Sequence, residues 1–141
     1  SEDDYVIIHD AARPIVYQDI IDDLIEKAKA NGNACSAVSC YETVVLTENR
    51  TSGKEQIDRT RIVRVQTPQC YNYGLIKSLY EKADKDNRED FVYANILAMN
   101  YGVEIYFSKG TNNNIKITTK DDIALFRALL YYINNAEGEE N

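Results

Sequence analysis

The chain has 141 residues, 44% apolar and 28% charged, which suits one domain with its own core and is too short for two. Its formal net charge of −7 argues against a nucleic-acid partner, because phosphate backbones bind to basic surfaces. No apolar run approaches the length of a membrane span, and the acidic start Ser1–Asp4 does not resemble a signal peptide. We therefore expect a cytoplasmic protein without membrane contact.

The first predicted elements are a buried strand, an amphipathic helix and a second strand. Tyr5–Ile8 is a continuous apolar run, typical of a strand covered on both faces of a parallel sheet. Apolar residues follow helical spacing over Asp19–Ala30, and Asn31 with Gly32 supplies the stop signal. Ala34–Cys40 is the next predicted strand.

A β-hairpin arm is predicted at about residues 41–62. Thr43–Thr47 and Gln56–Arg61 flank the polar turn Asn49–Gly53, and an extended stretch continues to about Val65. The arm has β-branched residues but few large apolar ones. Such a hairpin is only marginally stable alone, so we expect it to contact a partner surface.

The second half begins with two predicted helices and a strand. Leu75–Ala83 has helical spacing, and so has Phe91–Tyr101, which ends at Gly102. Val103–Phe107 is then predicted as a strand.

The last predicted elements are a short strand and a terminal helix. Ile115–Thr118 has the strand pattern, and Thr119 with Asp122 forms a capping-box-like helix start. Ala136–Asn141 is acidic, has no apolar anchor and is predicted to be a disordered tail.

This order predicts an α/β fold, a three-layer sandwich with a mostly parallel sheet and a projecting arm. Residues 1–135 are predicted to be the C-terminal portion of a single domain. The sheet is short of strands for a fold of this kind, so further strands are expected before Tyr5.

The cysteines and the single histidine argue against a zinc site. Cys35, Cys40 and Cys70 are odd in number and lack Cys-x-x-Cys spacing, so they are predicted to be buried reduced thiols. His9 is the only histidine, which leaves too few ligands for the usual His/Cys zinc sites. We interpret His9 as a framework residue rather than an acid or base.

The loop after the first strand, His9–Pro14, is a candidate site. It lies where open α/β sheets place their ligand crevice. Asp10 can accept hydroxyl hydrogen bonds or help to hold a metal, and Pro14 restricts Arg13 to an extended backbone. The alternative is a structural turn in which Asp10 caps amides and Arg13 forms a salt bridge.

Two further residues have both a binding and a structural interpretation. Thr67 precedes Pro68. The proline restricts the backbone and so holds the Thr67 hydroxyl near the end of an extended stretch, although Thr-Pro pairs are also common in turns. Lys116, between two isoleucines, faces either solvent or a ligand. Positively charged residues concentrate in the His9–Pro14 loop, in the stretch before Thr67 and at Lys116, which indicates a local phosphate pocket. They are Arg13, Arg59, Arg61, Arg64 and Lys116.

Three segments together resemble one enzyme family. They are His9–Pro14 (HDAARP), Arg59–Gln69 (RTRIVRVQTPQ) and Asn114–Thr119 (NIKITT). They resemble the 2-C-methyl-D-erythritol 4-phosphate cytidylyltransferases and the related ribitol-5-phosphate enzymes, over the chain up to about Leu130. The resemblance implies a Rossmann-like nucleotidyltransferase fold. It also implies transfer of CMP from CTP to a polyol phosphate, with Mg²⁺ bound mainly through the CTP phosphates.

The resemblance also implies roles for single residues near the substrate. Asp10, Arg13 and Thr67 would orient the polyol, and Lys116, as the catalytic residue, would hold the attacking phosphate. The family's glycine-rich nucleotide loop has no counterpart before Ser1. We therefore expect the C-terminal portion of such an enzyme, unable to turn over CTP by itself.

On the arm, the resemblance gives Thr43 and Arg59 contacts with the substrate of a partner subunit, which implies a homodimer with composite sites. The alternative is a solvated charged hairpin. Arg61 and Arg64 are interpreted as solvated charges. The family's acidic-threonine segment is replaced here by Arg88–Tyr93.

Three hypotheses stay open at this point. The chain belongs to an enzyme of isoprenoid precursor synthesis acting on 2-C-methyl-D-erythritol 4-phosphate, to one acting on ribitol 5-phosphate or another polyol phosphate, or to a non-catalytic binding or dimerisation module. Ala11-Ala12 and Asp58-Arg59 favour the first.

Overall fold

The computed structural model describes residues 1–89 and 91–136. Its centre is a four-stranded sheet with the strand order β1 (Tyr5–Ile8), β5 (Val63–Asn72), β2 (Asn33–Ser39) and β6 (Phe107–Lys109). β5 is antiparallel to its neighbours β1 and β2, whereas β2 and β6 are parallel. Three strands thus share one direction, as expected of a mostly parallel sheet.

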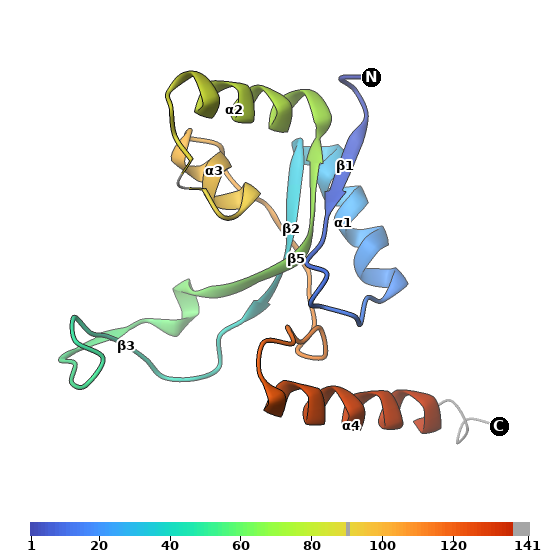
Figure 1. The fold of residues 1–141 in the computed structure, drawn as a ribbon, viewed down its shortest axis with the longest axis vertical. Coiled ribbons are helices and arrows are strands. Elements are labelled where there is room, and N and C mark those ends of the chain that lie inside the picture. Colours follow the sequence, from blue (N-terminus) through green and yellow to red (C-terminus); the bar gives the residue numbers. More distant parts are fainter. Residues whose placement is uncertain (90, 137–141) are drawn as a thin grey trace.

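Helix α1 (Gln18–Asn31) covers one face of the sheet, beside β2 and β5 (Figure 1). Leu24 and Ala28 on α1 form a buried cluster with Ala34 and Cys70 from the strands. Gly32 ends α1 with φ 85°, a left-handed conformation that glycine adopts without steric cost.

Helices α2 (Tyr73–Lys85) and α3 (Ala94–Asn100) cover the opposite face. Ile76 and Leu97 on these helices pack in a second cluster around Tyr71 and Cys35. Cys35 and Tyr71 directly follow the two strand residues of the first cluster, and consecutive strand residues point to opposite faces. The two clusters therefore establish the three-layer α/β sandwich.

The predicted arm is confirmed. β3 (Val44–Leu46) pairs antiparallel with β4 (Glu55–Ile57), and a 3-10 turn over Arg59–Arg61 leads into β5. The hairpin projects away from the sheet (Figure 1). Thr47 and Asn49 close its turn through side-chain hydrogen bonds.

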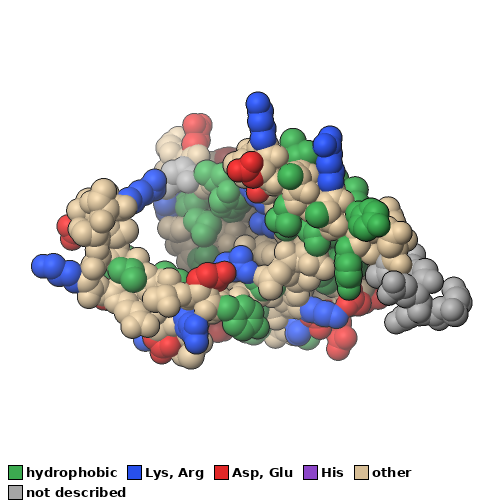
Figure 2. All heavy atoms as spheres, turned by 90° about the horizontal axis from the view of Figure 1, so that it is seen from below, with side chains coloured by type: hydrophobic (Ala, Val, Ile, Leu, Met, Phe, Trp, Pro, Cys, Tyr) green, Lys and Arg blue, Asp and Glu red, His purple; other side chains and the backbone are tan. Residues whose placement is uncertain are grey.

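Helix α4 (Lys120–Ala136) begins with the predicted capping arrangement. The carboxylate of Asp122 accepts hydrogen bonds from the amides of Thr118 and Thr119, which lower the Asp122 pKa to about 2. The apolar residues of α4 stay largely exposed, and apolar side chains are visible in the view from below (Figure 2). The predicted acidic tail falls on residues 137–141, outside the described residues; Ala136 belongs to α4.

The course of β5 differs from the prediction. The extended stretch does not end near Val65 but continues through Pro68 to Asn72, between β1 and β2. The register shifts there, because Cys35 pairs with Gln69 whereas Ala37 pairs with Val65. This irregularity accommodates proline inside a central strand, which its missing N–H otherwise disfavours.

Two predicted strands are also revised. β6 begins only at Phe107, because the side chain of Asn33 replaces strand pairing by bonding the backbone of Glu104 and Tyr106. Ile115–Thr118 is not a strand; its Ile117 amide bonds the carbonyl of Ala12.

Smaller corrections concern one helix and the first strand. The third helix begins at Ala94 rather than Phe91. β1 lies at the sheet edge, and Ile7 and Ile8 are not covered as expected, with exposed fractions of 40% and 36%. Among the described helices, none has the length and apolar character needed to cross a membrane.

Candidate active site

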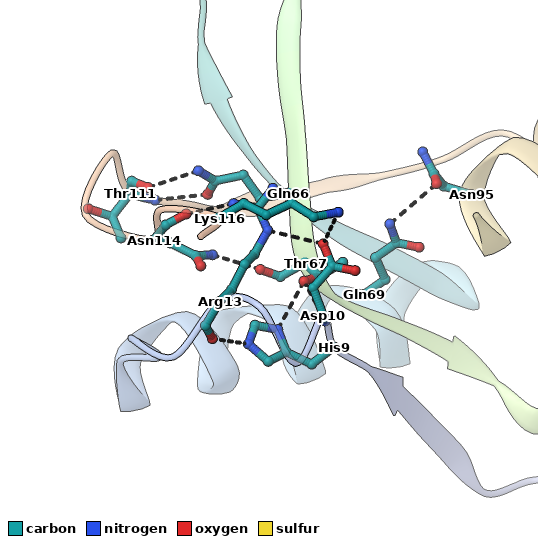
Figure 3. Close-up of polar contacts among 10 residues, drawn as sticks. All are labelled: His9, Asp10, Arg13, Gln66, Thr67, Gln69, Asn95, Thr111, Asn114 and Lys116. Carbon is teal, nitrogen blue, oxygen red and sulfur yellow. Dashed lines mark hydrogen bonds and ion pairs between the residues drawn. The ribbon is translucent and has the colours of Figure 1, made fainter. Parts of the chain in front are cut away.

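The loop after β1 is fixed by hydrogen bonds to Thr67 on β5 (Figure 3). The Thr67 hydroxyl accepts from the Asp10 amide at 3.0 Å and lies 3.0 Å from Nδ1 of His9. The other ring nitrogen of His9, Nε2, donates to the Arg13 carbonyl at 2.8 Å. In the neutral ring, Nδ1 therefore accepts the Thr67 proton. Both ring nitrogens are occupied, as expected of a framework histidine.

Asp10, Arg13 and Lys116 form one charged cluster. Oδ2 of Asp10 lies 3.0 Å from Nζ of Lys116 and 3.4 Å from Nε of Arg13. Partial burial acts to raise the pKa of Asp10, but the hydrogen bond and charge of Lys116, with those of Arg13, outweigh it and lower the pKa. The same contact with Asp10 raises the pKa of Lys116. The cluster thus carries two positive charges and one negative charge at neutral pH.

Asn114 connects this cluster to β5. Its carbonyl accepts from Nη1 of Arg13 at 2.6 Å, and its side-chain Nδ2 donates to the Thr67 carbonyl at 2.6 Å. The side chain is buried. Asn114 is not among the predicted site residues, although it begins the NIKITT segment. The structure shows that it holds Arg13 and Thr67 in place.

The cluster opens into a small cavity of about 260 Å³. An adjoining cavity of about 350 Å³ shares part of its wall. Nζ of Lys116 lies 5.6 Å from the ring centroid of Tyr93, within cation–π range. The residues common to both walls are Asp10, Thr67, Gln69, Tyr93 and Lys116. Three predicted site residues therefore face the same space as Tyr93 and Gln69, which are not among the predicted site residues.

The arm residues lie elsewhere within this chain. Neither Thr43 nor Arg59 lines these cavities, and Nη1 of Arg59 donates to the Tyr41 carbonyl at 2.7 Å. Arg64 also differs from a purely solvated charge, because its guanidinium bonds the side chain of Asn112 at 2.5 Å. The three cysteines are buried and unpaired, as predicted.

The charged cluster around Asp10 makes the free energy of unfolding depend on pH. The folded-state pKa of Asp10 lies below its ordinary value of 3.8, so the unfolded chain takes up the proton first as pH falls. The stability contributed by Asp10 is present above pH 3.8 and is lost as pH falls through the lower folded pKa. Denaturant unfolding at several pH values should therefore show the wild type losing its advantage over Asp10→Asn in acid. A stability difference that stays constant down to pH ~2 would contradict this assignment of the Asp10 pKa.

Comparison with known proteins identifies the family of this chain. The family model described as IspD, 2-C-methyl-D-erythritol 4-phosphate cytidylyltransferase, matches residues 1–132. The chain belongs to this cytidylyltransferase family. The resemblance inferred from the three sequence segments is thereby confirmed.

Individual members of the cytidylyltransferase family carry two different names. Ribitol-5-phosphate cytidylyltransferase of Lacticaseibacillus paracasei is 38% identical over 131 residues, covering 92% of this chain and 56% of that protein. 2-C-methyl-D-erythritol 4-phosphate cytidylyltransferase of Clostridium novyi is 36% identical over 130 residues, with the same two coverages. The chain thus spans little more than half the length of these relatives.

Solved structures of the cytidylyltransferase family share the fold. The 2-C-methyl-D-erythritol 4-phosphate cytidylyltransferase of Thermus thermophilus matches with a TM-score of 0.79 at 26% identity, covering 89% of this chain and 61% of that one. The Francisella tularensis enzyme matches with a TM-score of 0.78 at 30% identity, covering 92% and 60%. The Rossmann-like fold expected from the sequence is confirmed.

The described residues do not form a metal site of their own. They contain no group of three or more His, Cys, Asp or Glu side chains able to hold an ion. Among them, Asp10 is the only carboxylate lining the two cavities, and it already contacts two cations. These described side chains therefore do not fit a Mg²⁺ ion by themselves.

Proposed function

We propose that this chain forms the polyol-phosphate site of a cytidylyltransferase, which transfers CMP from CTP to 2-C-methyl-D-erythritol 4-phosphate and releases pyrophosphate. The reaction would be a cytoplasmic step of isoprenoid precursor synthesis. The observation that carries the proposal is the convergence of Asp10, Arg13, Thr67 and Lys116 on one small cavity in a chain of this family. A carboxylate and a hydroxyl suit polyol hydroxyls, and the two cations suit a phosphate.

The charges of the cluster suggest how the polyol phosphate binds. Its phosphate would take Lys116 away from Asp10, and the released carboxylate would then accept polyol hydroxyls. Arg13, whose guanidinium donates to the Asn114 carbonyl, would stay in place as the second positive charge of the site. The site therefore positions a nucleophile and needs no general base, because a phosphate oxygen is already ionised.

The chemical step is an in-line substitution at phosphorus. The positioned phosphate oxygen forms a bond to the α-phosphorus of CTP, and the bond from that phosphorus to the bridging oxygen breaks, so that pyrophosphate leaves with the electron pair. Lys116 would stabilise the negative charge shared by the two phosphates. Mg²⁺ carried by the CTP phosphates would neutralise the leaving group.

A second candidate substrate is ribitol 5-phosphate. The 38% identity to the Lacticaseibacillus paracasei ribitol-5-phosphate enzyme favours it. A product assay with CTP and each polyol phosphate, on the protein in its full natural length, separates the two. Formation of the CDP-methylerythritol product supports the first proposal, whereas CDP-ribitol alone supports the second. Inactivity with both would favour a non-catalytic binding or dimerisation module.

We also propose that the arm joins two copies of the protein. It projects from the domain, and it exposes apolar side chains at Val45 and Leu46, with exposed fractions of 47% and 53%. Thr43 and Arg59 lie away from the cavity of their own chain, so they are available to a partner's site.

Sedimentation is expected to show a dimer. Removing the hairpin tip, by replacing residues 47–52 with a two-residue turn, should shift the population toward monomer. The corresponding control replaces the exposed Lys120 on α4 with Ala and should leave the dimer intact. A strict monomer at high wild-type concentration would contradict composite sites.

A further inference from the structure

One wall of the 260 Å³ cavity consists of side chains that the proposed mechanism does not use. Gln69 on β5 and Asn95 on α3 line it, and both are nearly buried, with exposed fractions of 4% and 7%. Figure 3 shows their amide groups pointing toward each other, on the side of the cavity away from Arg13.

A chain of hydrogen bonds fixes the direction of both amides. The buried Tyr71 hydroxyl donates to Oε1 of Gln69 at 2.7 Å. Because this oxygen accepts, the other end of the Gln69 amide, Nε2, is the donor to Oδ1 of Asn95 at 3.3 Å. The Tyr71 proton is used, so the Cys35 thiol, 3.4 Å away, is the donor to the Tyr71 oxygen.

Burial keeps Tyr71 and Cys35 protonated. Tyr71 and Cys35 are completely buried. Burial raises the pKa of Tyr71 far above its ordinary value and that of Cys35 to about 11, so both groups stay protonated at neutral pH. The Tyr71 hydroxyl therefore remains available at neutral pH as the donor to Gln69.

The chain ends in a donor without an acceptor. Oδ1 of Asn95 accepts from Gln69, which leaves Nδ2; within the described part of the chain Nδ2 donates to no protein group, and it is open to the cavity rather than fully enclosed. An amide donor that opens on a cavity pairs there with water or with a ligand. The cavity is thus lined by the cations of Lys116 and Arg13, by the carboxylate of Asp10 and by an oriented N–H donor of Asn95.

We propose that Asn95 is a specificity-determining residue for the polyol, donating from Nδ2 to a hydroxyl oxygen of a polyol chain whose phosphate lies at Lys116. Tyr71 and Gln69 are positioning residues that hold Asn95 in this orientation. The inference rests on the proposed function, because it assumes a polyol phosphate in this cavity. A site with an oriented donor discriminates against a ligand that places a methyl group there, since the donor then stays unpaired.

The test distinguishes the affinity that comes from the polyol from the affinity that comes from its phosphate. Calorimetric titration of the full-length protein gives dissociation constants for inorganic phosphate, 2-C-methyl-D-erythritol 4-phosphate and ribitol 5-phosphate. The ratio of the inorganic phosphate constant to a polyol phosphate constant is the affinity gained from the polyol. In Asn95→Leu this gain should fall by about 5- to 100-fold for the tighter polyol, with phosphate affinity unchanged.

Two variants complete the design. Tyr71→Phe removes the donor that orients Gln69 and should lower the gain in the same direction, by a smaller factor, without changing phosphate affinity. Asn100→Ala alters an exposed asparagine at the end of the same helix and should change neither constant. If Asn95→Leu fails to fold, Tyr71→Phe, which keeps the shape of the buried ring, provides the test.

The outcomes distinguish the two levels of the proposal. A wild type that binds both polyol phosphates no more tightly than inorganic phosphate contradicts the proposed function and this inference with it. A wild type with a clear gain that Asn95→Leu and Tyr71→Phe retain contradicts the inference alone. Equal loss of inorganic phosphate binding in Asn95→Leu also contradicts it, because the effect would then be a general disturbance of the cavity.

Discussion

Replacement of Lys116 with Met is expected to lower kcat/KM for CMP transfer by about 10²–10³-fold. Methionine keeps the length and apolar stem of the side chain but removes its charge. Without Nζ, the phosphate loses the cation nearest to Asp10, and the Asp10 carboxylate, now paired with Arg13 alone, repels it. Steady-state kinetics at several polyol phosphate concentrations, on the full-length protein, measure the loss.

The control for this variant is Lys120→Met. Lys120 is exposed in the first turn of α4, four residues along the chain, and does not line the cavity. It should retain the wild-type kinetics. If Lys116→Met retained more than about a third of the wild-type kcat/KM, the assignment of the phosphate to Lys116 would be wrong.

Replacement of Asn114 with Ala is expected to lower the free energy of unfolding by about 1–3 kcal/mol. The variant leaves the carbonyl of Thr67 buried without its donor. Because the Asn114 backbone also accepts from Arg13, loosening this segment should displace Arg13 and Lys116 together. Urea denaturation followed by circular dichroism measures the stability, and the same preparation should bind phosphate more weakly.

The matched control is Asn112→Ala, in the same loop. Asn112 is exposed, and among the described residues its side chain bonds the exposed Arg64 and no other side chain. Its effect on unfolding should stay within about 0.5 kcal/mol. Equal effects from the two asparagines would show that the bond from Asn114 to Thr67 does not stabilise the site.

The elements that were predicted correctly have strong local signals. The helix over Gln18–Asn31 follows from apolar spacing and the stop at Gly32, and the arm follows from two β-branched stretches around a polar turn. Asp10 and Lys116 stand inside distinctive segments that predict site residues, and the structure brings Oδ2 of Asp10 to 3.0 Å from Nζ of Lys116.

The errors have a non-local origin. Pro68 indicated the end of a strand, but β1 and β2 hold both sides of β5 and the register shift absorbs the proline. β6 begins at Phe107, later than expected, because the side chain of Asn33 bonds the backbone of Glu104 and Tyr106 just before it. Asn33 is more than 70 residues away in the chain. Such long-range contacts have no signature in a local window of sequence.

The same reason explains the site residues that sequence reasoning missed. Asn114 and Asn95 are ordinary polar residues in their local segments. Their importance comes from Thr67 and Gln69, which reach them from β5 across 47 and 26 residues of chain. Only the fold shows that one asparagine holds the cluster and the other faces the cavity.

A crystal structure of the full-length protein with 2-C-methyl-D-erythritol 4-phosphate tests the central proposal most directly. We expect a phosphate oxygen within hydrogen-bond distance of Lys116 Nζ and polyol hydroxyls on the carboxylate of Asp10 and the hydroxyl of Thr67. A phosphate bound away from Lys116, or a polyol outside the cavity lined by these residues, would contradict the proposed site.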